Sequence, residues 1–186
     1  MQYFKTLTKG KVMTVYPETE VRAAAERLIE HHSKASEVTD WTFFVDETYT
    51  EDAEYICEYA GVRPVTAIGR KQIKDTHYGE DMGGFEDWTF PYDGYAVNGN
   101  RIITHWWNRG PGKRPDGSFY QTPGASFITY AGDGMFSHQH DFFDLAHQMK
   151  LCDELEEAGL LNTRLKEVWV KPMKVKLVEM LTSNME

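Results

Sequence analysis

Residues 98–145 read NGNRIITHWWNRGPGKRPDGSFYQTPGASFITYAGDGMFSHQHDFFDL, and this stretch decides the fold. Asn98-Gly99 is the strongest short-range hairpin signal in the chain, because both residue types tolerate the positive φ angles of a tight turn. A long turn with two prolines (Gly110–Gly117) and the turn Gly132-Asp133-Gly134 follow. The segments between the turns are predicted to be strands, namely Arg101–Arg109, Phe119–Tyr130 and Met135–Phe143. Strands joined by hairpins form an antiparallel sheet.

Helical patterns precede this sheet. Apolar residues recur at helical spacing from Thr19 to His32, and Thr19 suits an N-cap. A shorter helix is predicted over Trp41–Thr50. The alternating segment Glu54–Tyr59 then predicts a strand, and Gly69–His77 a brief helix.

The sheet has a predicted strand before it and a predicted helix after it. Trp88, Phe90 and Tyr92 share one face of a strand that continues through Val97. Asp144 suits the N-cap of a final helix whose apolar stripe ends at Gly159; Val168–Val170 and an amphipathic segment after Pro172 follow it.

Composition limits the classes of function. The chain has 186 residues, enough for one domain with an internal pocket, and its net charge of −9 disfavours nucleic acid as a partner. Its two cysteines form no CxxC pair, which fits a reducing cytoplasm, and we find no signal peptide or membrane span. Nucleotide-binding motifs are absent, so no cofactor is expected. Aromatic residues make up 13%, so some are expected to line a cavity for a flat or apolar small molecule.

Several local strings resemble the SnoaL-like, nuclear-transport-factor-like superfamily. They are Tyr49-Thr50-Glu51-Asp52-Ala53-Glu54-Tyr55 before a strand, Gly69-Arg70-Lys71-Gln72-Ile73 at a helix start, the turns Asn98-Gly99 and Gly132-Asp133-Gly134, and His140-Asp141-Phe142-Phe143-Asp144-Leu145. Their order resembles that of the family from about Thr19 to Gly159. The resemblance implies an α+β fold, in which a cone-shaped, curved antiparallel sheet wraps around three to four helices and encloses one ligand pocket.

The resemblance also divides the chain. Residues 1–18 form an N-terminal arm, 19–160 the SnoaL-like domain, and 161–186 a C-terminal extension that we expect at a subunit interface. Members of the family often assemble through the outer face of the sheet. We therefore expect a homodimer or homotrimer, with Trp106 exposed for such a contact.

Asp141 is the first candidate catalytic residue. Because side chains alternate along a strand, Gln139 and Phe143 share its face, whereas His138 and His140 point to the other side. The resemblance places Asp141 where limonene epoxide hydrolases and SnoaL-type cyclases carry a catalytic aspartate, inside the pocket. A carboxyl group walled by aromatic rings has a raised pKa, which suits proton transfer near neutral pH. The structural alternatives are capping of the final helix and an ion pair with a surface lysine.

His105 is the second candidate. It shares a strand face with Trp107, and the resemblance puts that face inside the pocket. His105 is then expected to pair with Asp141 as a general acid or base, although a core histidine without a catalytic role remains the alternative.

Tyr55 corresponds to a pocket tyrosine of the family and is expected to donate a hydrogen bond to a substrate oxygen. Four aromatic residues are expected to wall the pocket, and these are Trp88, Phe90, Tyr92 and Trp107. Cys57 stands where steroid isomerases carry their carboxylate base and epoxide hydrolases an asparagine, and His105 and Trp107 replace two further groups of the epoxide hydrolases. Steroid isomerisation and epoxide hydrolysis therefore lose support as functions of this chain.

A His/Asp pair with a tyrosine donor favours a cofactor-independent lyase or dehydratase acting on a small aromatic hydroxylated substrate. Diarylpropane lyases of the superfamily act on lignin-derived compounds, which suits this aromatic-rich chain. A cyclase or isomerase and a non-catalytic binding module remain alternatives. His138 and His140, with Asp144, also resemble the metal strand of cupins, but the second cupin motif is missing, and we expect no metal.

Overall fold

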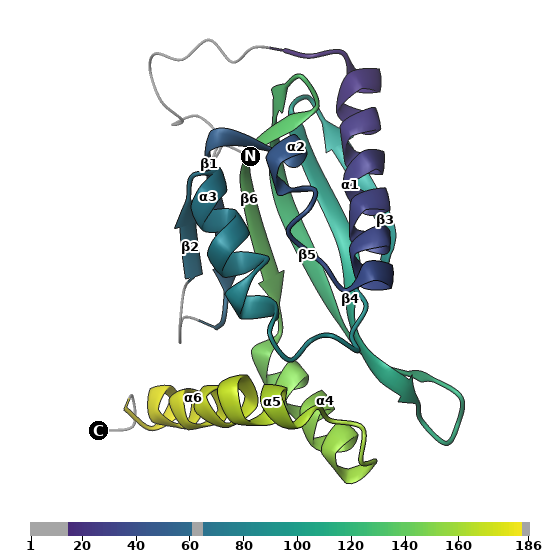
Figure 1. The fold of residues 1–186 in the computed structure, drawn as a ribbon, viewed down its shortest axis with the longest axis vertical. Coiled ribbons are helices and arrows are strands. Elements are labelled where there is room, and N and C mark those ends of the chain that lie inside the picture. Colours follow the sequence, from purple (N-terminus) through teal and green to yellow (C-terminus); the bar gives the residue numbers. More distant parts are fainter. Residues whose placement is uncertain (1–14, 61–64, 184–186) are drawn as a thin grey trace, which may run out of the picture.

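The computed structural model describes residues 15–60 and 65–183 and consists of one curved sheet with helices on one side and across one end (Figure 1). The sheet has six strands in the order β2-β1-β6-β5-β4-β3. Their bounds are β1 Tyr49–Glu58, β2 Val65–Ile68, β3 Tyr92–Asn98, β4 Arg101–Lys113, β5 Phe119–Gly132 and β6 Met135–Phe143. All neighbours pair antiparallel except β1 and β6, which are parallel. The predicted fold class, an α+β cone with a curved, mainly antiparallel sheet, is confirmed.

Shifts of register let the sheet curl. They occur in four of the five strand pairings, and examples are Tyr92/Gly94 between β3 and β4 and Thr129/Tyr130 between β5 and β6. An irregular pairing bends a strand and increases its twist. The inner face of the curled sheet therefore surrounds a buried core instead of packing as a flat layer.

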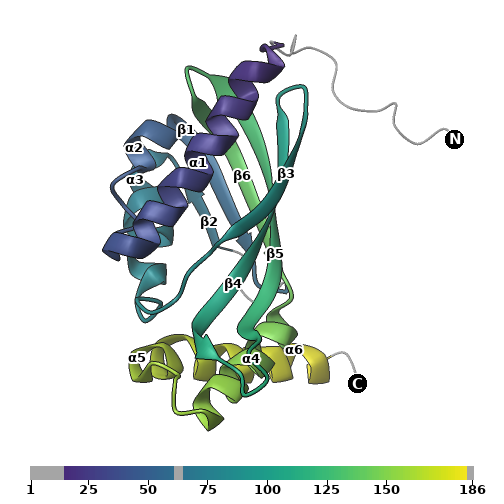
Figure 2. The same cartoon turned by 90° about the vertical axis from the view of Figure 1, so that its right-hand side faces the viewer.

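The first helix, α1 (Glu18–Val38), lies against the sheet beside β3 (Figure 2). Its buried stripe includes Val21, Ala25 and Leu28 and continues to His32, so a histidine occupies an apolar helix position. After it come α2 (Val45–Thr48), α3 (Arg70–Gln72), η1 (Ile73–His77) and η2 (Glu80–Met82). Of these, α2 leads into β1, whereas α3, η1 and η2 connect β2 at one edge of the sheet with β3 at the other.

The parallel pairing of β1 with β6 is the feature that positions the site. Tyr55 lies opposite Gln139 and Cys57 opposite Asp141, and all four side chains are buried. Ser126 of β5 lies opposite Asp141 on its other side. Three adjacent strands thus point polar groups at one place in the core.

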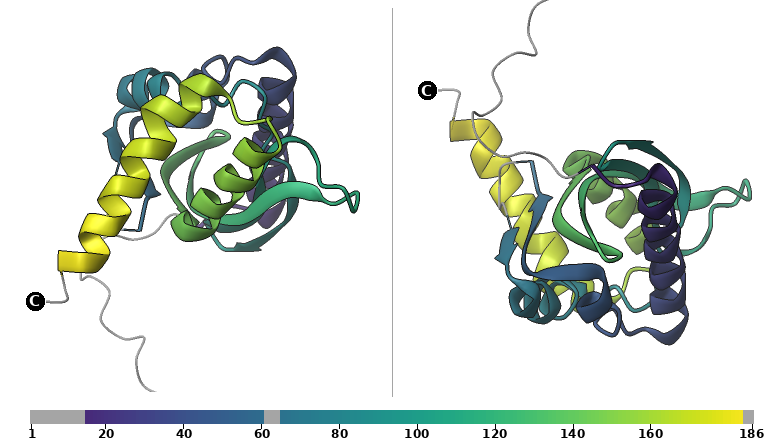
Figure 3. Two further views of the ribbon diagram at one scale, coloured as in Figure 1. Left: turned by 90° about the horizontal axis from the view of Figure 1, so that it is seen from below. Right: turned by 90° about the horizontal axis from the view of Figure 1, so that it is seen from above.

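The C-terminal helices close one end of the sheet. They are α4 (Leu145–Glu157), α5 (Thr163–Leu165), η3 (Lys166–Val170) and α6 (Lys171–Ser183), and in Figure 3 α4 and α6 lie across that end. As predicted, Asp144 caps α4: its side chain accepts from the backbone N–H of His147 at 3.0 Å. Leu165 of α5 packs closely on Gly84: a Cβ atom on Gly84 would lie 2.8 Å from the backbone of Leu165. None of the described helices is long and apolar enough to cross a bilayer.

The N-terminal half shows the main differences from the predicted elements. The first helix begins at Glu18, with Pro17 at the N-cap position, so the predicted Thr19 cap is wrong. Only Val45–Thr48 of the second predicted helix is helical, and β3 begins at Tyr92, so Trp88 and Phe90 lie in a loop. Residues 1–14 of the predicted arm lie outside the described residues.

Candidate active site

A cavity of about 90 Å³ lies between the inner face of the sheet, α1 and the helices that close its end. Ten aromatic residues line it: Trp41, Tyr55, Tyr59, Tyr78, Phe85, Phe90, Tyr92, Trp106, Phe143 and Trp169. The polar residues of the wall include His32, Cys57, His77, Asp81, Asn108, Asp141 and Gln148. Apolar walls with a few convergent polar groups are typical of small-molecule sites.

Asp141 lies in this wall with 7% of its surface exposed and accepts hydrogen bonds from its neighbours. The hydroxyl of Tyr55 donates to Oδ2, and Gln139 Nε2 donates to Oδ1 at 3.0 Å. Burial raises the pKa of Asp141, while hydrogen bonds from Ser126, Tyr55 and Gln139 favour the carboxylate and oppose that rise. The result is a carboxyl group more basic than an ordinary aspartate, held in one orientation.

Cys57 lies beside Asp141 but is a poor nucleophile. Burial raises the pKa of its thiol well above the ordinary value, and the charge of Asp141 acts in the same direction. The protonated thiol contributes lining and not covalent chemistry.

His77 lies beside Tyr55, the tyrosine that donates to Asp141. Its ring lies against that of Tyr55, with 3.8 Å between centroids, and Tyr55 in turn is bonded to Asp141. Burial lowers the pKa of His77 to about 3, so the imidazole is neutral. Its Nδ1 is buried and has no hydrogen-bond partner among the residues that the structure describes. A buried polar atom without a partner is rare and requires an explanation.

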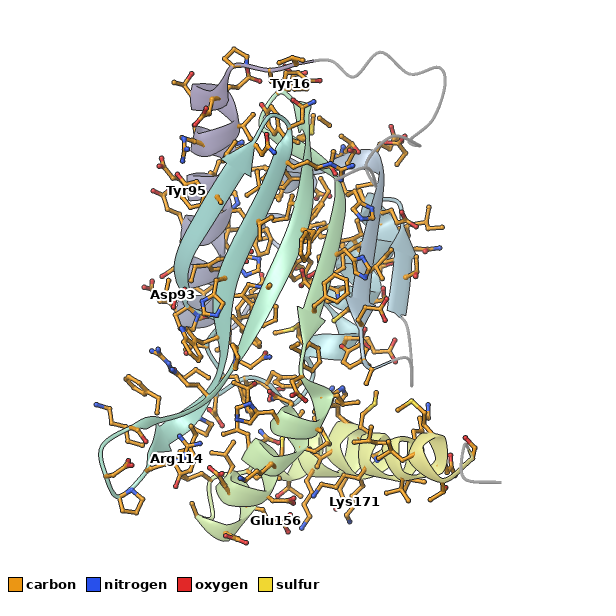
Figure 4. All side chains as sticks on the ribbon, turned by 180° about the vertical axis from the view of Figure 1, so that it is seen from behind. Tyr16, Asp93, Tyr95, Arg114, Glu156 and Lys171 are labelled. Carbon is orange, nitrogen blue, oxygen red and sulfur yellow. The ribbon has the colours of Figure 1, made fainter. Side chains whose placement is uncertain are left out.

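The predicted orientation of His105 and Trp107 is wrong. On β4 the even-numbered positions from Ile102 to Gly110 are buried, among them Thr104, Trp106 and Asn108, so His105 and Trp107 belong to the outer face. The side chain of His105 is 45% exposed and bonds to Asp93 of β3, and Trp107 donates to the same carboxylate at 3.1 Å. Asp93, labelled in Figure 4, lies toward the edge of the sheet. The predicted pair of His105 with Asp141 is therefore not formed.

The alternation along β4 contains a signal that assigns the correct face. Arg101 and Arg109 lie on the same strand face as His105, because they are an even number of residues away from it, and two arginines are expected to face water. The opposite parity places Trp106 inside, where its indole N–H donates to Ser126 at 2.8 Å. The expectation that Trp106 is an exposed contact residue is wrong.

Other predicted pocket residues take different positions. Phe90, Tyr92 and Phe143 line the cavity, as the sequence analysis placed them. Trp88 is buried behind the wall, against Phe85 with 5.3 Å between ring centroids, and does not line the cavity. Gln139 is also behind the wall, since its amide is fully buried by Asp141, Tyr55 and Tyr49.

The residues that sequence reasoning missed come mainly from helices. His32 had a signal, because it continues the apolar stripe of α1; His77 follows Ile73 by four residues and shares its helix face. Gln148 and Trp169 reach the cavity from α4 and η3, and nothing in their local pattern marks them.

The two strand histidines considered for a metal point outward. His138 lies 3.2 Å from Glu54, and His140 lies 3.2 Å from Glu58. In the part of the chain that the structure describes, no group of three or more His, Cys, Asp or Glu side chains is arranged to hold a metal ion.

The curved sheet and the cavity on its inner face define an α+β cone with a pocket. Residues 29–138, more than half of the chain, match the SnoaL-like domain family, and the chain belongs to that family. No curated protein matches the chain.

Three solved structures illustrate the likeness in fold. A candidate SnoaL-like polyketide cyclase from Jannaschia sp. CCS1 is 20% identical with a TM-score of 0.55, covering 75% of this chain and 96% of that one. An NTF2-like protein from Anabaena variabilis is 16% identical, with a TM-score of 0.53 and coverage of 72% and 96%. A candidate isomerase from Bacillus subtilis is 17% identical, with a TM-score of 0.52 and coverage of 76% and 98%. The fold is therefore one in which proteins described as cyclases and isomerases occur.

Proposed function

We propose that the protein is a cofactor-independent lyase or dehydratase that uses Asp141 as its acid-base group on a small, apolar, aromatic hydroxylated substrate. One observation carries the proposal: a buried carboxyl group with a raised pKa forms part of an aromatic cavity wall and is held by Tyr55 and Gln139. A group of this kind is suited to proton transfer near neutral pH.

The proposed step is an elimination. The Asp141 carboxylate takes a proton from a substrate carbon, the electron pair of that C–H bond forms a double bond, and the bond to the neighbouring hydroxyl breaks. The protonated carboxyl then returns its proton to the departing hydroxide, which leaves as water, and the enzyme is regenerated. His77 takes the place that the sequence analysis gave to His105, as a neutral imidazole that hydrogen-bonds a substrate oxygen near Tyr55.

The volume of the cavity limits the size of the substrate. Its volume of about 90 Å³ is well below the roughly 300–1,000 Å³ of pockets for drug-sized ligands. We therefore propose a substrate with a single ring, such as a monocyclic 3-hydroxy-carbonyl compound, in preference to a two-ring lignin-derived one.

An isomerase or cyclase is the second candidate. The same carboxyl group can return the proton to another substrate atom, and similar structures are described as a candidate isomerase and a candidate cyclase. Loss of water distinguishes the elimination from both.

Asp141→Asn tests the proposal. A panel of monocyclic 3-hydroxy-carbonyl compounds is incubated with the protein in D2O, and NMR follows both water loss and exchange of the carbon-bound proton. We expect wild-type protein to catalyse both and Asp141→Asn to reduce kcat by about 10²–10⁴-fold. Asp93→Asn, on the outer face, is the matched control and keeps wild-type rates. Binding without exchange or turnover would instead support a binding module.

A further inference from the structure

Gln139 sets the direction of a buried hydrogen-bond chain. Its Nε2 donates to Asp141 Oδ1 at 3.0 Å and to the Tyr55 oxygen at 3.2 Å, and its Oε1 accepts from Tyr49 at 2.7 Å. The reversed amide would put its oxygen against the carboxylate oxygen of Asp141, which is repulsive. The amide orientation is thus fixed, and it commits the single hydroxyl proton of Tyr49 to Gln139.

The direction continues from Tyr49 to His32. Because Tyr49 has used its proton, Tyr78 must donate in the 2.9 Å contact between their hydroxyls. Tyr78 has then used its own proton, so the 3.3 Å contact with His32 requires that His32 Nε2 carries the hydrogen. Burial lowers the pKa of His32 to about 3, so the ring is neutral and holds one proton only.

The chain ends at Tyr92. Since Nε2 of His32 is protonated, its Nδ1 is an acceptor, and the Tyr92 hydroxyl, 3.3 Å away, donates to it. Tyr92 also lines the cavity. Its proton is committed to His32, so its oxygen can only accept a hydrogen bond from a ligand.

We infer that the Tyr92 oxygen is a second ligand-binding position, which accepts a hydrogen bond from a hydroxyl group of the ligand. The inference rests on the proposed function in taking this cavity as the substrate site. The carboxylate of Asp141 is also an acceptor, and the hydroxyl proton of Tyr55 already donates to it, so neither group offers a donor to a ligand. Tyr92, Tyr55 and Asp141 therefore favour a ligand that brings its own donor over one that brings only acceptors.

A pair of probes that differ in one donor tests this inference. 4-Methylphenol and its methyl ether have the same ring, and their binding is measured by quenching of tryptophan fluorescence. We expect wild-type protein to bind the phenol at least about tenfold more tightly, because a site built for a hydroxyl leaves a buried acceptor unpaired when the hydroxyl is absent. Tyr92→Phe should bring the ratio toward one. Tyr95→Phe, on the same strand but bonded to Glu26 outside the cavity, should keep it.

Equal affinity of the two probes for wild-type protein, an unchanged ratio in Tyr92→Phe, or no binding of either probe each overturns the inference. A second measurement examines the chain directly. ¹⁵N NMR of the His32 ring should show the tautomer protonated at Nε2, and protonation at Nδ1 would overturn the assigned direction. The probe affinities and the His32 tautomer are both measured without turnover. If Asp141→Asn leaves the rate unchanged, the proposed elimination is refuted, and these two measurements still test the role of Tyr92. If these two measurements contradict the role of Tyr92, the rate experiment still tests the elimination.

Discussion

Histidines on the two sides of the sheet lie in opposite environments. His32 and His77 line the cavity, and burial keeps both rings neutral. His105, His138 and His140 lie on the outer face, each beside a carboxylate of a neighbouring strand. The side of the sheet, and not the residue type, decides which histidine can take part in chemistry at the cavity.

The two environments also differ in how much the free energy of unfolding falls when a hydrogen-bond partner is removed. The outer contacts between histidine and glutamate are partly exposed, and exposed polar pairs contribute at most about 0–1 kcal/mol. Inside, the partners are enclosed in a medium of low polarity, where a group left without a hydrogen bond is expensive. Substitutions on adjacent residues of one strand can therefore test the comparison.

The largest effect is expected at Gln139. Gln139→Ala removes the acceptor of Tyr49 and a donor to Asp141, both buried, and should lower the free energy of unfolding by about 2–4 kcal/mol. His138→Ala, one residue away on the other face, should cost less than about 1 kcal/mol. Urea unfolding of both variants measures the difference. Equal losses would show that the two faces do not differ as described.

A smaller effect is expected from two glycines. A Cβ on Gly124 would lie 2.4 Å from the Trp106 ring, whereas a Cβ on Gly94 would meet nothing within 4 Å. Gly124→Ala should therefore displace the indole and cost about 1–3 kcal/mol, while Gly94→Ala should be neutral or stabilising by up to about 1 kcal/mol. Thermal unfolding measures both. A loss of stability in Gly94→Ala as large as in Gly124→Ala would contradict the comparison.

The smallest effect is a change in how stability depends on pH. Between about pH 3 and 6.5 the unfolded chain binds a proton at His77 that the folded protein does not, so this residue makes stability rise with pH. His77→Phe should reduce the slope by about 1.4 kcal/mol per pH unit. Asp141 has a raised pKa in the folded protein, so it makes stability fall as pH rises, and Asp141→Asn should steepen the slope. Unfolding titrations between about pH 4 and 6 check both signs, and slopes that move in the same direction would refute the assignment.

The sequence predicted the sheet well because its signals are local. The first hairpin turn lies one residue later than predicted, at Gly99-Asn100, because Asn98 still pairs with Arg101; the second lies at Gly132-Asp133-Gly134 as predicted, and positive φ angles occur at Gly99, Gly132, Asp133 and Gly134. The inward face of β6 was also predicted correctly, and its histidines have outer partners. Alternation grouped Gln139 and Phe143 with Asp141, and the resemblance to the family placed that face inside.

The site was predicted only in part, because the faces of β4 were assigned wrongly and the helical residues are remote. Each face of β4 holds an indole and a polar residue, Trp106 with Asn108 and Trp107 with His105, and only Arg101 and Arg109 at the ends of the segment mark the outer face. His77 and Trp169 reach the cavity through packing between segments far apart in the chain. Such contacts depend on how the helices dock, which the local sequence does not specify.

Trp169, Gln148 and Asp141 all follow residue 138, where the match to the family ends, although they help to form the cavity wall. The matched portion thus supplies most of the cavity wall, including Asp81, and the later portion supplies Asp141, the proposed acid-base group, and part of the lining. Two relatives that match the family equally well over the segment corresponding to residues 29–138 can therefore bind different ligands. A chimera that exchanges residues 139–183 between such relatives is expected to transfer ligand preference together with that segment.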